Sequence, residues 1–136
     1  MKKLLALDLG ITTGFAVYEV PTGSLLEYGV IDYPEFETRL KELRDRWIVS
    51  YSVAEVPVIM RGALGNQLAE VVAITSRELM RQVDLVDPAS WKQTPYRKLN
   101  PPPGKLTPHE RDAIRLGAWY HATRLQGSLA VSNIGH

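Results

Sequence analysis

The sequence predicts an α/β fold, built on a five-stranded mixed sheet with helices on both faces. Two observations lead to this prediction. The first quarter of the chain holds three strand-like segments joined by short turns, which indicates an antiparallel meander. The rest alternates helical and strand-like segments, which is typical of parallel strands joined by helices. A length of 136 residues favours a single domain, 1–136.

Three strands are predicted near the N-terminus. Lys3–Leu9 is an apolar run of strand length, and it ends in an Asp-Leu-Gly sequence. Thr13–Val20 is rich in β-branched and aromatic residues, and Pro21–Gly23 marks a turn after it. Leu25–Tyr33 is the third strand, and Pro34 closes it. The short turns make neighbouring strands antiparallel.

The apolar spacing then changes to that of a helix. Apolar residues recur at helical intervals between Phe36 and Trp47, with charged residues between them. A short strand at Tyr51–Val56 precedes a long helix at Gly62–Arg81, and Val83–Val86 is the last strand. A final helix is predicted at Thr107–Leu125. The predicted element order is therefore β-β-β-α-β-α-β-loop-α.

Composition and charge restrict the class of protein. Apolar residues make up 45% of the chain, which is enough for a buried core, and there is no cysteine. No apolar run approaches the roughly 18 residues of a membrane span, and Asp8 interrupts the N-terminal run too early for a signal peptide. We therefore expect a cytoplasmic protein with no membrane partner.

The charge distribution indicates a polyanion partner only weakly. The net charge is +1, but residues 1–60 carry 6 basic and 9 acidic side chains, whereas residues 61–136 carry 10 basic and 6 acidic ones. Such an asymmetry is compatible with nucleic-acid binding. A solvated basic face is an equally good interpretation of the counts alone.

Two carboxylates lie near the ends of predicted strands. Asp8 follows a buried strand, where a carboxylate is costly without a partner, although an aspartate before a Gly10 turn has a structural alternative as a cap. Glu55 lies near the end of the fourth strand, and its alternative is a solvated edge position. If the first and fourth strands are parallel neighbours, the two carboxylates lie side by side and repel each other. A bound cation would remove that conflict.

The last helix adds two further candidates. Thr107 is the predicted N-cap and Pro108 the first helical residue, and Glu110 completes a capping box, so a structural role is preferred for Glu110. His109 and Asp112 are three residues apart and share the helix face that packs on the sheet. His109 is open to three interpretations: metal ligand, general base, or exposed residue of the first turn.

The combined pattern predicts a metal centre. Oxygen-rich clusters suit Mg²⁺ or Mn²⁺. Two such ions about 3.5–4 Å apart activate water and stabilise the leaving oxygen in phosphodiester cleavage. The candidate metal ligands, which are also candidate catalytic residues, are Asp8, Glu55, His109 and Asp112.

At these residues the chain resembles the RuvC family of Holliday junction resolvases, which have an RNase H-like fold, and especially its short phage-type members. The matching segments are Leu5–Gly14, Ala54–Glu55 and His109–Ala113. Val86–Lys92 is similar to the segment that brings a lysine near the active site in such folds, which implies that Lys92 is a fifth catalytic residue. The resemblance covers most of the chain. It implies a metal-dependent nuclease acting on branched DNA, in the host cytoplasm if a phage encodes it.

The resemblance also implies a homodimer that binds a four-way junction and nicks two strands symmetrically. The helix at Gly62–Arg81 has apolar residues over a wide arc, which one sheet face cannot cover, and deep burial within one subunit is the alternative. The residues predicted to form the dimer contact are Leu64, Leu68, Val71, Val72 and Leu79.

DNA contacts are predicted in the second half of the chain. The segment from Trp91 to Arg111 holds five basic residues and one acidic residue around a proline-rich loop, and basic side chains there would neutralise phosphates. Tyr96 would stack on a base or anchor the loop. Residues 59–61 occupy the position of the family's apolar wedge. The predicted DNA-binding residues are Met60, Arg61, Lys92, Tyr96, Arg97, Lys98 and Lys105.

Two other functions remain open from the sequence. The segment from Asp8 to Gly14 also reads like the phosphate loop of sugar kinases and actin, which would make the protein a phosphotransferase. Those proteins need two such halves around a nucleotide, and this chain has room for one. The second alternative is a DNA-binding module without catalytic activity.

Overall fold

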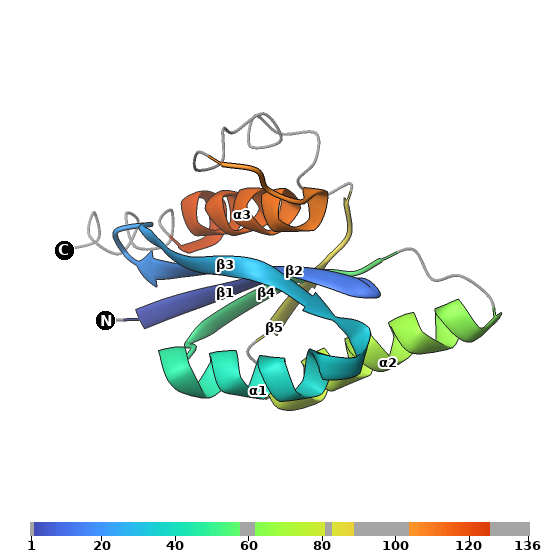
Figure 1. Ribbon diagram of the computed structural model, residues 1–136. Helices are drawn as coiled ribbons and strands as arrows, with labels where there is room; N and C mark the ends of the chain where they lie inside the picture. The colour runs from blue at the N-terminus through green and yellow to red at the C-terminus, as the bar shows by residue number, and fades with distance from the viewer. Residues whose placement is uncertain (1, 58–61, 81–82, 89–103, 126–136) are drawn as a thin grey trace.

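The structure is a computed structural model that describes residues 2–57, 62–80, 83–88 and 104–125 (Figure 1). Five strands form one sheet in the order β3-β2-β1-β4-β5. The strands are β1 (Lys2–Asp8), β2 (Thr12–Val20), β3 (Leu25–Asp32), β4 (Tyr51–Glu55) and β5 (Val83–Val86). The first three strands pair antiparallel, and β1, β4 and β5 run parallel. The predicted mixed sheet is confirmed.

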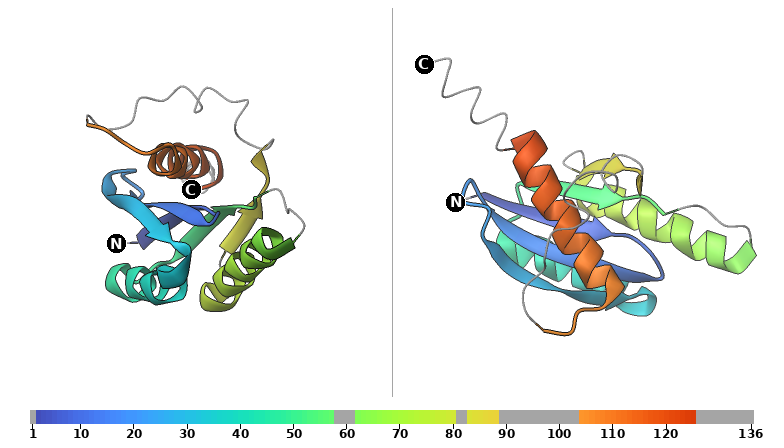
Figure 2. Two further views of the ribbon diagram at one scale, coloured as in Figure 1. Left: turned by 45° about the vertical axis from the view of Figure 1, so that its right-hand side comes forward. Right: turned by 90° about the horizontal axis from the view of Figure 1, so that it is seen from above.

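Helices cover both faces of the sheet, as predicted. The helices are η1 (Tyr33–Glu35), α1 (Phe36–Trp47), α2 (Gly62–Glu78), α3 (Pro108–Tyr120) and η5 (His121–Leu125). α1 and α2 lie on one face, and α3 crosses the other (Figures 1 and 2). Segment η5 continues α3 as a π-helix.

Each face of the sheet has its own core. Alternate residues of a strand point to opposite faces, so Leu5 and Leu7 of β1 pack with α1 and α2, whereas Leu4 and Ala6 pack with α3. Phe36, which begins α1, is 1% exposed and is the largest fully buried side chain. The α3 face therefore has a core that is separate from the one beneath α1 and α2.

The long helix ends earlier than predicted. α2 ends at Glu78 rather than at Arg81. The amide of Leu79 still bonds to the carbonyl of Thr75, but Met80 has a φ of 54°, which is left-handed and stops the helix. The sequence has no glycine at this point, so it gives no signal for the stop.

The apolar arc of α2 is largely covered within the chain. Leu68, Val71 and Leu79 are buried in the core, Val72 packs against that core, and Leu64 is 41% exposed. Most of the predicted dimer contact is therefore already used by the chain's own core, and a contact through this helix must rely on Leu64 and its neighbours. No helix within the described ranges is long and apolar enough to cross a membrane.

Candidate metal centre

The two strand carboxylates lie on neighbouring strands at the same level. Asp8 ends β1 and Glu55 ends β4, and the parallel register pairs their Cα positions directly. Glu55 is 4% exposed, on a strand with neighbours on both sides, so a solvated edge position is wrong for it. The predicted neighbouring positions of the two carboxylates are confirmed, at the carboxyl ends of parallel strands, where sites of α/β proteins gather.

The first turn of α3 is fixed by its cap. The Thr107 hydroxyl accepts a hydrogen bond from the amide of Glu110 at 3.1 Å, and the Glu110 carboxylate accepts one from the amide of Thr107 at 3.1 Å. Pro108 occupies the first helical position. Glu110 is therefore a helix cap, which leaves His109 and Asp112 as the side chains of this turn that are available to a site.

The helix brings both of these side chains to Asp8. His109 Nδ1 lies 3.3 Å from Asp8 Oδ2, although the two residues are 101 positions apart in sequence. The Asp112 carboxylate lies close enough for its charge to act on Asp8. His109 remains 46% exposed at its side chain, whereas Asp8 is 14% exposed. The structure therefore places His109 against Asp8, with Glu55 and Asp112 near enough for their charges to act on Asp8.

The electrostatics of the centre are those of crowded acids. Burial of Asp8, followed by the charges of Glu55 and Asp112, raises the pKa of Asp8 from its usual 3.8 to about 6, and contact with His109 opposes this rise. The ionised form of Asp8 is therefore disfavoured, and either a proton or a nearby cation would relieve it.

The three carboxylates match the oxygen ligands that Mg²⁺ and Mn²⁺ prefer, whereas the imidazole of His109 is a donor more typical of Zn, Fe, Ni or Cu ions. The repulsion that raises the pKa of Asp8 is what a cation would relieve. Within the described ranges, no three or more acidic, histidine or cysteine side chains are placed so that together they could hold a metal ion. Binding of an ion would therefore require the side chains to close around it.

The backbone turn after Asp8 is held by a residue that the sequence analysis missed. The Thr13 hydroxyl accepts a hydrogen bond from the amide of Gly10 and donates one to its carbonyl, and Thr13 is fully buried. The spacing of Gly10 and Thr13 is a sequence signal for such a turn. This turn links β1 to β2 and fixes the backbone that follows the carboxylate of Asp8.

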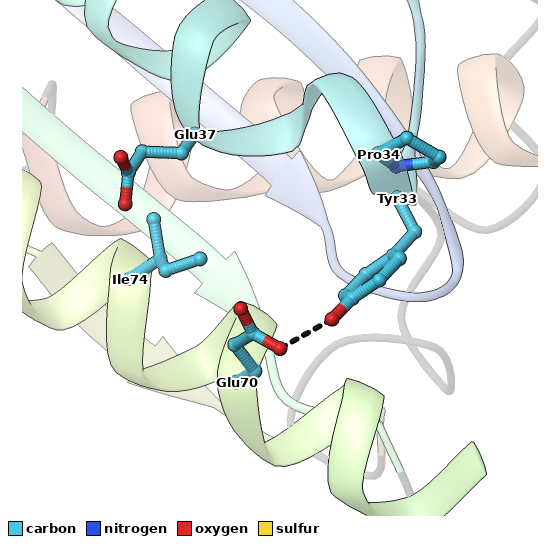
Figure 3. A pocket seen from close by; sticks show the side chains of 5 residues that line it. All are labelled: Tyr33, Pro34, Glu37, Glu70 and Ile74. Atoms are coloured by element: carbon cyan, nitrogen blue, oxygen red, sulfur yellow. Dashed lines mark hydrogen bonds between the residues drawn. The ribbon is translucent and has the colours of Figure 1, made fainter. Parts of the chain in front are cut away.

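The centre lies apart from two pockets on the other face of the sheet. One of about 260 Å³ lies between η1, α1 and α2; Ile74 also lines it, and the Tyr33 hydroxyl donates a hydrogen bond to the Glu70 carboxylate there (Figure 3). The other is bordered by Arg44 and Ile48 at the end of α1. Neither contains a residue of the acidic centre.

One of the predicted DNA-binding residues lies within the described ranges. Lys105 is exposed, two residues before the cap of α3. The other predicted residues, including the proposed catalytic lysine, lie outside the described ranges: Met60, Arg61, Lys92, Tyr96, Arg97 and Lys98.

No family model matches the chain, and no curated protein matches it in sequence. Solved structures do match. RuvC of Thermus thermophilus in complex with a Holliday junction substrate superposes with a TM-score of 0.71 and 15% identity, covering 93% of this chain and 98% of that chain. A structure of Thermus thermophilus RuvC gives 0.67 and 16%, covering 88% and 95%.

Fowlpox virus resolvase, in complex with Holliday junction DNA, matches more distantly, with a TM-score of 0.49 and 16% identity, covering 69% of this chain and 66% of that chain. The two RuvC structures match nearly the whole chain in fold. The fold predicted from the sequence resemblance is therefore confirmed: the chain has the RNase H-like α/β fold of RuvC.

Proposed function

We propose that this protein is a metal-dependent endonuclease that cleaves branched DNA, with a four-way junction as its substrate. The observation that carries the proposal is the convergence of Asp8, Glu55, His109 and Asp112 from two strands and a helix. The fold supports it, because a structure of the same fold is a RuvC bound to a Holliday junction. The Mg²⁺ or Mn²⁺ ions would be held by the three carboxylates.

The residues of the centre would have different tasks. When bound, a pair of such ions supplies an activated water and stabilises the leaving oxygen. Asp8 and Glu55 are fixed by the sheet and would hold the shared position, and Asp112 would close it from the helix. The His109 side chain is more exposed than that of Asp8, which it contacts. His109 would therefore complete the ligand set or exchange a proton with solvent.

Binding of DNA would involve the basic second half of the chain. Lys92 would steady the scissile phosphate, and Lys105 together with the loop of Arg97 and Lys98 would contact the phosphate backbone. Two copies of the chain would cut the two strands of a junction symmetrically. Leu64 is exposed on α2, so it would belong to the contact between the copies.

The test uses labelled four-way junction and linear duplex of the same sequence, each incubated with Mg²⁺, Mn²⁺ or a chelator. We expect cleavage of the junction with either ion and none with the chelator. Asp8→Asn and Asp112→Asn should each lower the cleavage rate by about a thousand-fold, which corresponds to about 4 kcal/mol, because each removes a charged ligand. Junction binding, measured by electrophoretic mobility, should persist in both variants.

The matched control is Asp84→Asn. Asp84 is also a sheet carboxylate, but it bonds to the Tyr120 hydroxyl at 3.2 Å, and its register partner is Val53, two residues before Glu55. This variant should cleave like the wild type. Loss of both binding and cleavage in the site variants would indicate a structural role. Tight binding of ATP would favour a phosphotransferase, and inertness toward every branched substrate would favour a non-catalytic DNA-binding module.

A further inference from the structure

A close backbone contact joins β2 to the first turn of α3. Gly14 lies beneath this turn, where a Cβ atom would overlap the carbonyl oxygen of His109 and stand 3.1 Å from the amide nitrogen of Glu110. The obstacle is the backbone of the helix, which cannot rotate away as a side chain can. Only glycine at this position permits the observed separation between strand and helix.

The position of this contact in the sheet is directly beside the acidic centre. Gly14 is the antiparallel register partner of Asp8, so the two Cα atoms face each other across neighbouring strands. Strands lie about 4.8 Å apart. The backbone that touches Gly14 belongs to His109, whose side chain contacts Asp8. One strand position therefore sets how closely the first turn of α3 approaches the carboxylates of the sheet.

A second close contact holds α3 further along its length. A Cβ on Gly117 would overlap the ring of Tyr18 and stand 3.1 Å from the Cβ of Ala6. The Tyr18 hydroxyl donates a buried hydrogen bond of 2.6 Å to the carbonyl of Ile114. This contact also holds α3 close to the sheet, but at a position beyond the first turn of the helix, where no residue of the candidate centre lies.

We propose that Gly14 is a positioning residue of the metal centre: by leaving no Cβ beneath His109, it sets the distance at which His109 and Asp112 meet Asp8 and Glu55. The inference rests on the proposed function, because it treats those four residues as one site. A larger residue at position 14 would lift the first turn of α3, and the ligands from the helix would separate from those of the sheet.

The experiment compares Gly14→Ala with Gly29→Ala in the full chain. Gly29 also lies in a strand, and a Cβ there would stand 2.9 Å from the Phe15 ring, so that variant strains the sheet without touching α3. Binding of Mn²⁺ is measured by calorimetry, without DNA and without reference to cleavage. Hydrogen exchange of the amides of Glu110 and Arg111, which both bond to Thr107, reports on the first turn of α3.

We expect Gly14→Ala to bind Mn²⁺ at least about 10-fold more weakly than the wild type and to exchange those two amides at least about 10-fold faster, in keeping with a lost ligand geometry. Gly29→Ala should melt at a lower temperature but keep wild-type Mn²⁺ affinity and exchange. If Gly14→Ala does not fold alone, all three proteins are measured in trimethylamine N-oxide, which favours the folded state.

The outcomes separate this inference from the function on which it rests. Wild-type Mn²⁺ affinity and exchange in folded Gly14→Ala would overturn the role of Gly14 and leave the nuclease proposal standing. An equal loss of Mn²⁺ affinity in Gly29→Ala would also overturn it, because general strain would then explain the effect. Absence of Mn²⁺ binding by the wild type would overturn the metal centre itself, and the role of Gly14 with it.

Discussion

The two faces of the sheet are built differently. The face beneath α1 and α2 is filled by large apolar side chains, such as Leu7, Phe15 and Phe36. The face beneath α3 has small residues at its centre, such as Ala6 and Ala16, and two carboxylates at its end. The carboxylates of the candidate centre therefore lie on the α3 face, at the end of a core that also contains large side chains such as Leu4 and Trp119.

This difference suggests that one face serves mainly as a packed core and the other carries the candidate site. Close packing of large side chains favours one rigid arrangement, which suits a scaffold. Small residues let α3 lie close to the strands, so that side chains from the helix reach those of the sheet. If the two faces differ in this way, removal of a large side chain from the α1–α2 face should lower stability and leave metal binding intact, whereas a change at the acids of the α3 face should alter metal binding.

The largest effect on stability is expected from Phe36→Ala. Phe36 is 1% exposed in the core beneath α1, and loss of such a side chain costs about 3–5 kcal/mol through lost burial and the cavity that remains. Urea unfolding measures the change. The metal affinity of the fraction that stays folded should equal that of the wild type, and a specific loss of metal binding would contradict the division between the faces.

An increase in the free energy of unfolding is expected for Asp8→Asn in the absence of metal. The pKa of Asp8 is raised to about 6 in the folded protein, against an ordinary 3.8, so ionisation of Asp8 opposes folding by up to about 3 kcal/mol at pH 7.5. The variant should therefore be more stable than the metal-free wild type at pH 7.5. This advantage should shrink as the pH falls from 6 and vanish below 3.8, where the carboxyl is protonated in both states.

Urea unfolding at several pH values, with and without Mg²⁺, measures this effect. The ion should stabilise the wild type and leave Asp8→Asn nearly unchanged, because binding to the folded state alone adds stability. If the variant is less stable than the wild type at pH 7.5 without metal, the Asp8 carboxylate stabilises the folded protein through a structural partner, and the prediction is wrong.

A smaller loss is expected for Tyr18→Phe on the α3 face. The substitution removes the buried hydrogen bond from the Tyr18 hydroxyl to the carbonyl of Ile114, which contributes about 1 kcal/mol. Thermal unfolding measures the loss, and Mn²⁺ affinity should be unchanged, because this contact lies away from the acids. A large loss of affinity would mean that Tyr18, and not Gly14, controls the position of α3.

The smallest effect should be a gain in stability, which we expect from Ser52→Ala on the α1–α2 face. The Ser52 hydroxyl is buried without a hydrogen-bond partner among the described residues, so its removal should stabilise the fold by up to about 1 kcal/mol. Thermal unfolding would show a slightly higher melting temperature. A clear decrease would indicate that the hydroxyl has a partner, such as a buried water molecule.

Local patterns were enough to predict much of the fold and of the centre. Strand length and short turns gave the element order, and helical spacing placed Asp112 on the face of α3 that meets the sheet. The role of Gly14 could not be predicted, because it depends on a helix more than ninety residues later in the chain. For α2 the sequence left two alternatives, burial within one subunit and a dimer contact, since a wide apolar arc fits an internal core as well as a dimer.

The most direct test of the metal centre is an anomalous difference map from crystals of the wild type soaked in Mn²⁺, collected from protein that cleaves a four-way junction. The account predicts a peak within ligand distance of Asp8, Glu55 and Asp112. Active protein whose Mn²⁺ peaks all lie away from Asp112 would contradict it.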